Sequence, residues 1–208
     1  MTGQRIKIGI LLLSMGILTA LGAACAGAGE QAANKGTANS EPLVKTDPAK
    51  PPSDKGDQIV TGGDLAFMND AAPGGMAEVE LGKLAVKQAA NNDVKQFAQK
   101  MIEDHSKAGE ELKALAAQKK VMLPPDVLPA HKQLMEKLSK LSGADFDKEY
   151  VKAMVEAHEK DVAAFENVSK TAADADVKAF ATKTLPTLKM HLEMIKAMAD
   201  KMGVKAKS

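Results

Sequence analysis

The sequence has no tryptophan, one tyrosine and five phenylalanines, and aromatic residues make up only 3% of its 208 residues. Strands favour aromatic and β-branched side chains, so this scarcity argues against an all-β fold or a large parallel sheet. A single cysteine excludes an internal disulfide framework and a cysteine-based zinc site. The formal net charge of +1 argues against a nucleic-acid partner held by phosphate neutralisation.

Common catalytic motifs are also missing. The chain contains no Gly-rich phosphate loop, no His-Glu-x-x-His, no Cys-x-x-Cys and no Gly-x-Ser-x-Gly. No spacing of serine, histidine and aspartate suggests a triad. The sequence therefore assigns no catalytic residue, and we expect a binding or structural protein rather than an enzyme.

The first 25 residues have the form of an export signal. Arg5 and Lys7 precede an apolar stretch at 8–21, which is too short to span a bilayer comfortably. Cys25 ends the segment LGAAC, which resembles a bacterial lipobox with its leucine one position too far from the cysteine. The alternative is ordinary cleavage at a nearby Ala-x-Ala site. Lipidation of Cys25 would anchor an exported protein to the membrane, as a periplasm-facing or outer-membrane lipoprotein of the cell envelope.

Residues 26–63 are rich in glycine, proline, alanine, serine, asparagine and lysine and show no helical or strand period. Such a segment cannot bury enough apolar surface to offset the entropy of ordering it. We predict a disordered tether with a reach of roughly 35 Å. It is either a spacer that holds the domain off a membrane or a low-complexity leader.

From Asp64 to about residue 203 the apolar residues recur with the helical period of 3.6. Long helices are expected from Asp64 to about Ala90, after Asn92 or Asp93 to about Lys119, from Asp145 through Val168, and from Asp174 or Asp176 to about Met202. Pro73-Gly74-Gly75 should interrupt the first helix, and Pro186 should kink the last. The pattern predicts an all-α four-helix bundle, with a short extra helix at about 130–141 between the second and third long helices.

Three of the four histidines lie on the apolar stripes of their helices. His105, His158 and His191 are each near the middle of a long helix, and the midpoints of antiparallel neighbours lie at the same height. The three imidazoles should therefore meet in one layer of the core. Imidazole ligands suit zinc, iron, copper or nickel. His131, at the start of the short helix, is expected to be exposed or capping and is excluded.

Carboxylates near this layer were assigned by helical phase. Glu80 is flanked at four-residue spacing by apolar residues and is predicted as the fourth ligand, whereas Glu78 should point further out. Asp104 and Asp161 are predicted to hold the histidine rings from outside the ligand set. The alternative is that each histidine is an ordinary buried side chain bonded to its own local carboxylate.

Methionines recur every four residues at Met190, Met194, Met198 and Met202. Thioethers bind Cu(I), so this row is a candidate copper site in an exported protein. We favour the alternative that methionine is an adaptable core filler in a sequence with few aromatic residues.

Four segments of the domain together resemble the bacterial DUF4142 family: MAEVELGKLA, VKQFAQKMIEDHSKAGEELKALA, LSGADFDKEYVKAMVEAHEKDVAAFE and LPTLKMHLEM. The resemblance implies an envelope-exported bundle of the ferritin-like superfamily and no assigned activity. Di-iron oxidases of that fold use Glu-x-x-His pairs. Here Ile102, Val155 and Leu188 stand three residues before the histidines, which argues against oxidase or iron-storage activity.

These observations support two principal hypotheses and a weaker third. The first is a non-catalytic envelope module that meets a protein partner or the cell wall. The second is a metal-binding protein that uses the histidine layer and a transition metal ion. The third is a pH-sensitive bundle, because a buried histidine can become charged near pH 6.

Overall fold

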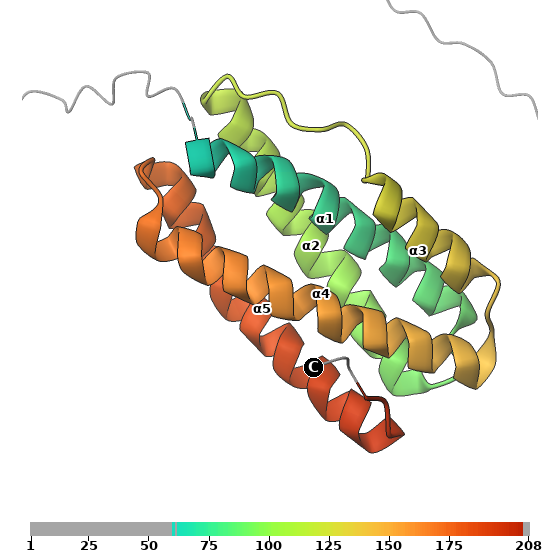
Figure 1. The fold of residues 1–208 in the computed structure, drawn as a ribbon. Coiled ribbons are helices and arrows are strands. Elements are labelled where there is room, and N and C mark those ends of the chain that lie inside the picture. Colours follow the sequence, from blue (N-terminus) through green and yellow to red (C-terminus); the bar gives the residue numbers. More distant parts are fainter. Residues whose placement is uncertain (1–59, 61, 206–208) are drawn as a thin grey trace, which may run out of the picture. The chain divides into compact units, whose positions relative to one another are not determined.

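The computed structural model describes residue 60 and residues 62–205, which form five helices and no strand. The helices are α1 (Gly62–Gln88), α2 (Asn92–Gln118), α3 (Pro129–Ser139), α4 (Gly143–Thr171) and α5 (Ala175–Met202) (Figure 1). The predicted export signal at 1–25, its Cys25 and nearly all of the predicted tether at 26–63 lie outside the described residues. Val60, which we had assigned to the tether, is buried in the core.

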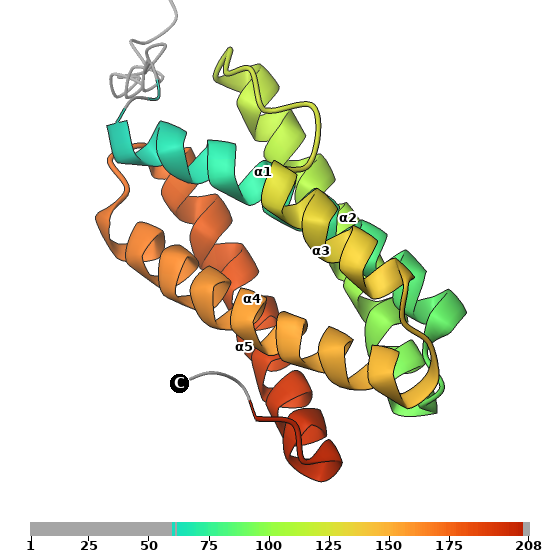
Figure 2. The same ribbon diagram turned by 45° about the vertical axis from the view of Figure 1, so that its right-hand side comes forward.

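The architecture is the predicted four-helix bundle with a short extra helix. The long helices form two antiparallel hairpins, α1 with α2 and α4 with α5, and the hairpins pack through α1 against α4 and α2 against α5. The chain crosses between the hairpins through an extended connection and α3, which lies against α1 and α4 (Figures 1 and 2). None of the described helices is long and apolar enough to cross a membrane.

Polar side chains set the helix boundaries. The Asn91 side chain accepts a hydrogen bond from the Asp93 amide and begins α2, one residue before the predicted start. Asp174 caps α5 as predicted, and Gly203 ends that helix in the left-handed conformation, at φ 64°. The α4 helix begins at Gly143, two residues earlier than expected.

The predicted interruption at Pro73-Gly74-Gly75 is wrong, because α1 runs through these residues as one helix. A proline removes one backbone hydrogen bond and a glycine weakens a helix, but tertiary packing supplies most helical stability in proteins. Phe67 before the segment and Leu81 after it are both buried in the bundle core and hold the two halves in place. The α5 helix also runs through its proline, Pro186, and the predicted kink at that residue stays a prediction.

Buried aspartates tie each hairpin to the turn of the other. Asp147 of α4 accepts hydrogen bonds from the backbone amides of Ala90 and Asn91, at 3.1 and 2.8 Å, in the α1–α2 turn. At the opposite end, Asp64 of α1 accepts one from the Asp174 amide at 2.8 Å, in the α4–α5 turn. The register between the two hairpins is therefore set at both ends of the bundle.

The apolar core consists of two clusters, one toward each end of the bundle. The cluster near the α1–α2 turn includes Val94, Phe97, Phe146, Tyr150 and Ile195. The cluster near the α4–α5 turn includes Phe67, Leu112, Phe165, Val177 and Phe180. The three candidate histidines lie in α2, α4 and α5 between these clusters, which places polar groups in the middle of the core.

Candidate metal centre

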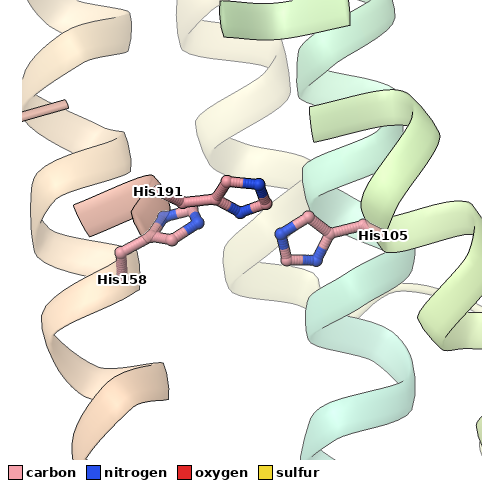
Figure 3. Close-up of side chains that lie close together, drawn as sticks. All are labelled: His105, His158 and His191. Carbon is pink, nitrogen blue, oxygen red and sulfur yellow. The ribbon is translucent and has the colours of Figure 1, made fainter. Parts of the chain in front are cut away.

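His105, His158 and His191 meet in the interior of the bundle, one each from α2, α4 and α5 (Figure 3). Their ring centroids are 5.4 to 5.7 Å apart, and their exposed fractions are 8%, 0% and 0%. One nitrogen of each ring can be chosen so that all three lie within 4.8 Å of one another. The convergence expected from the helical spacing is present.

Hydrogen bonds determine which nitrogen of His105 and His158 carries the proton. Nδ1 of His105 lies 2.9 Å from Oε2 of the buried Glu78, and Nδ1 of His158 lies 3.0 Å from the Met154 carbonyl oxygen. A carbonyl oxygen or a carboxylate accepts, so both Nδ1 atoms are donors. The lone pair of each ring is therefore on Nε2.

His191 differs from the other two histidines, because its Nε2 rather than its Nδ1 forms the hydrogen bond to a protein oxygen. Its Nε2 lies 2.8 Å from Oδ2 of Asp104, which also pairs with Lys100 at 3.1 Å. Burial tends to raise the pKa of Asp104, but hydrogen bonds from His191 and Lys100 outweigh it and lower that pKa. The ionised carboxylate accepts the Nε2 proton, and the lone pair of His191 is therefore on Nδ1.

The three lone-pair nitrogens are the ones without partners. Nε2 of His105, Nε2 of His158 and Nδ1 of His191 are buried and have no hydrogen-bond partner among the described residues. A metal ion with ligand distances of about 2.0–2.1 Å would require nitrogens about 3.5 Å apart. One nitrogen from each of the three rings already lies within 4.8 Å of the others, so a bound ion would require the rings to move closer together. This donor set, with outer carboxylates that orient the rings, fits a transition metal ion.

The assignment of Glu80 as the fourth ligand is wrong. Its side chain is 51% exposed and pairs with Lys83 at 2.8 Å on the outside of α1. Residues two positions apart on a helix are about 200° apart around the axis, so Glu78 takes the inward position. Met76 and Leu84, the apolar neighbours that suggested the inward phase of Glu80, are only partly buried.

The two predicted outer carboxylates have different roles. Asp104 orients His191 as expected. Asp161 instead lies beside Glu78 and hydrogen-bonds to it. Burial raises the pKa of Asp161 to about 8, with a further contribution from the charge of Glu78, and burial also raises the pKa of Glu78. This carboxyl pair therefore keeps a proton near neutral pH.

The histidines themselves are neutral at that pH. Burial lowers the pKa of His105 to about 4, against the raising effect of the charges of Asp161 and Asp104. Burial also lowers the pKa of His158 and of His191, although Glu78 and Asp104 oppose the shift. Neutral imidazole is the form that binds metal, so the site does not require deprotonation at neutral pH.

Sequence reasoning missed two neighbours of the cluster. Helical phase predicts Glu78 on the outside of α1, and helical spacing predicts Phe97 only as one member of an apolar stripe. The Phe97 centroid lies 6.3 Å from that of His158 and 6.1 Å from that of His191, so it covers one side of the cluster. The position of Phe97 in the helical period does not distinguish it from the other apolar residues of α2.

The remaining candidates lie elsewhere. Met190 and Met194 are 37% and 39% exposed, whereas Met198 is buried and the partly buried Met202 packs against the same core cluster, so these two act as core fillers. The methionine row winds from the surface of α5 into the core. His131 is a partly exposed residue of α3 and does not belong to the cluster, in agreement with its exclusion.

The fold and the cluster define a ferritin-like helical bundle with a candidate metal centre. The chain belongs to the DUF4142 family, described as a domain of unknown function, whose model matches residues 49–198. No curated protein matches the sequence.

Solved structures share the fold at low sequence identity. A DUF305 fragment from Deinococcus radiodurans is 13% identical with a TM-score of 0.61, and the match covers 68% of this chain and 98% of that one. A DUF305 protein from Streptomyces coelicolor, named as a secreted protein, is 15% identical with a TM-score of 0.60, covering 70% and 96%. CopM in its Cu(II)-bound form is 17% identical with a TM-score of 0.57, covering 66% and 96%.

Proposed function

We propose that this DUF4142 protein binds a transition metal ion, with copper as the first candidate, through His105, His158 and His191. The observation that carries the proposal is that each ring donates one proton to a protein oxygen and leaves its other nitrogen buried without a partner. A buried polar atom without a partner is costly and calls for an explanation. A bound ion shared by all three nitrogens would satisfy them together.

Copper is favoured by the chemistry of the donors. Among the divalent first-row metals, Cu(II) generally forms the strongest complexes with a given set of nitrogen ligands. The structures of CopM, which shares the fold, contain copper or silver. That likeness concerns the fold alone, so the donor set of this chain carries the proposal of copper.

The proposed role is to hold the ion rather than to carry out a reaction. The histidines are buried, and Phe97 and the two apolar clusters surround them. This environment suits sequestration or carriage of an ion. Glu78 and Asp104 would orient the ligands, and no residue is assigned a catalytic step.

Metal analysis of the purified full chain without a polyhistidine tag tests the proposal. We expect one ion per chain, and we expect substitution of any one of the three histidines by glutamine to abolish stoichiometric binding. His131→Gln is the matched control and should leave binding unchanged. Saturating metal at 100 times Kd should stabilise the wild-type fold by about 2.7 kcal/mol. A chain that takes up none of copper, zinc, nickel or iron would instead favour a structural module for a partner.

We also propose that the protein is exported and anchored to a membrane by a lipid on Cys25. The basic and apolar leader and the lipobox-like segment support this placement. Cys25→Ala should move the protein from the membrane fraction to the soluble fraction of the envelope. Continued membrane association of the variant would contradict lipid attachment at that residue.

A further inference from the structure

An ion can reach the three histidines only if the bundle provides a path, because none of them is more than 8% exposed. Most of the surrounding core is filled by packed side chains of the two apolar clusters. The helix walls next to the histidines, however, contain several glycines. These glycines differ in whether the space next to them is filled or open.

At Gly82 on α1, close packing against α2 leaves no room for a larger residue. A Cβ atom there would lie 2.9 Å from Cγ1 of Ile102 and 3.0 Å from the carbonyl oxygen of Ala98. Gly74, Gly75 and Gly109 are different, since a Cβ atom at any of these positions would meet nothing within 4 Å. Glycine in a helix interior lowers stability. These three positions therefore weaken α1 and α2 without a packing requirement.

The open positions border a small cavity beside His105. Its volume is about 40 Å³, and its walls include Gly75, Gly109, His105, Glu78 and Asp161. A larger groove of about 650 Å³ lies between α1, α2 and the connection that leads to α3. Gly75, Gly109 and His105 line this groove as well. The two spaces therefore share Gly75, Gly109 and His105 in their walls.

His105 provides the independent sign of a ligand. It is more than nine-tenths buried, it lines both the groove and the inner cavity, and its Nε2 has no partner among the described residues. The groove also carries three acidic residues and two lysines, and two of the acids are paired with lysines, Glu80 with Lys83 and Asp126 with Lys132. These charged residues are Glu80, Glu110, Asp126, Lys113 and Lys132.

We propose that the gap between Gly75 and Gly109 is the port through which a metal ion enters and leaves the histidine cluster. The inference rests on the proposed metal-binding function. An ion in the groove meets His105 first, exchanges its bound waters for the imidazole nitrogen, and then reaches His158 and His191 behind it. Helices α1 and α2 need not separate for this passage.

A second pocket makes the alternative route testable. It has a volume of about 510 Å³, lies between α1, α3 and α4, and touches the inner cavity at Gly74, Glu78 and Asp161. None of the three clustered histidines lines this pocket. It ends instead on the Glu78–Asp161 pair, and we therefore favour the groove.

Two stopped-flow measurements on the full chain test the port. Mixing the metal-free chain with Cu(II) gives the rate of uptake, and mixing the loaded chain with excess EDTA gives the rate of release. Gly75→Leu and Gly109→Leu should each slow uptake and release by about tenfold, because the added side chain fills the path. The equilibrium Kd should stay within about twofold, since both rates fall together. Gly75→Ala and Gly109→Ala, which add less volume, should give smaller effects in the same direction.

Gly63→Leu is the matched control, because Gly63 is an exposed glycine of α1 that also leaves open space but lines neither the groove nor the inner cavity. It should exchange copper at the wild-type rates. Slowing by Gly74→Leu alone would overturn the proposal in favour of the second pocket. Wild-type rates in every variant would also overturn it and indicate entry by opening of the bundle. Failure of the wild-type chain to bind Cu(II) at equilibrium would overturn the metal function itself, and the port with it.

Discussion

Oε2 of Glu78 lies 2.9 Å from Nδ1 of His105, and both side chains are more than nine-tenths buried. This contact joins α1 to the histidine cluster, to which that helix contributes no histidine. A carboxylate behind a ligating imidazole fixes the ring and increases its basicity. Glu78→Gln should therefore weaken metal affinity about tenfold or more in a competition titration.

The control for this prediction is Glu80→Gln. Glu80 loses the same charge on the same helix but lies at the surface with Lys83. Its metal affinity should equal that of the wild type. Equal losses in the two variants would show that net charge, rather than the contact with His105, determines the effect.

Asp161 should make the metal-free fold less stable as the pH rises toward 8. Its pKa is about 8 in the folded protein and 3.8 when unperturbed, because burial and the neighbouring Glu78 charge favour the protonated form. Between these values the folded state holds a proton that the unfolded state has released, so raising the pH favours unfolding. We expect the urea midpoint of the wild type to fall from pH 6.5 to pH 8, and Asp161→Asn to reduce this fall.

Below pH 6.5 the histidines act in the opposite direction. Their folded pKa values are lowered from 6.5, so the unfolded chain binds protons that the buried rings do not. Stability should therefore also fall with acidification, in the wild type and in Asp161→Asn alike. An unchanged slope between pH 6.5 and 8 in Asp161→Asn would contradict the assignment of that slope to the carboxyl pair.

Glycine substitutions should separate open positions from packed ones. Gly109→Ala should raise the free energy of unfolding by about 0.5–1 kcal/mol, because the methyl group meets open space and alanine favours the helix. Gly82→Ala should lower it by about 1–3 kcal/mol, because its Cβ would crowd Ile102 and the Ala98 carbonyl. Chemical denaturation of metal-free protein measures both. Stabilisation by Gly82→Ala would mean that α1 and α2 can separate freely at this point.

Asp147 should be important for stability although it is far from the histidine cluster. Its carboxylate accepts two amide hydrogen bonds from the α1–α2 turn and is buried. Asp147→Ala would leave two backbone donors without their acceptor and should cost about 2–3 kcal/mol. Asp145→Ala, at an exposed position of the same helix, should change the free energy of unfolding by less than about 0.5 kcal/mol. Similar losses in both variants would point to the first turn of α4 rather than the turn contact.

Much of the fold and part of the site could be predicted from local pattern. The 3.6-residue period located the helices, and the position of each histidine along its own helix located the layer in which they meet. The inward position of Glu78 could have been found in the sequence of α1, because Glu78 belongs to a row of residues spaced alternately by three and four. The inward positions with that spacing are Asp64, Met68, Ala71, Gly75, Glu78, Gly82 and Ala85. Alanine, glycine and polar residues make this stripe weakly apolar, and Met76 and Leu84 suggested a different phase.

The sequence by itself determined the helical class and the three inward-facing histidines, because these follow from periodicities within single helices. Only the tertiary structure decided that α1 continues through Pro73, that Glu78 rather than Glu80 faces His105, and which ring nitrogens are free. Those outcomes depend on atoms from different helices. Packing around Phe67 and Leu81 outweighs the local preference for a break, and oxygens on neighbouring turns and helices select the tautomer of each ring.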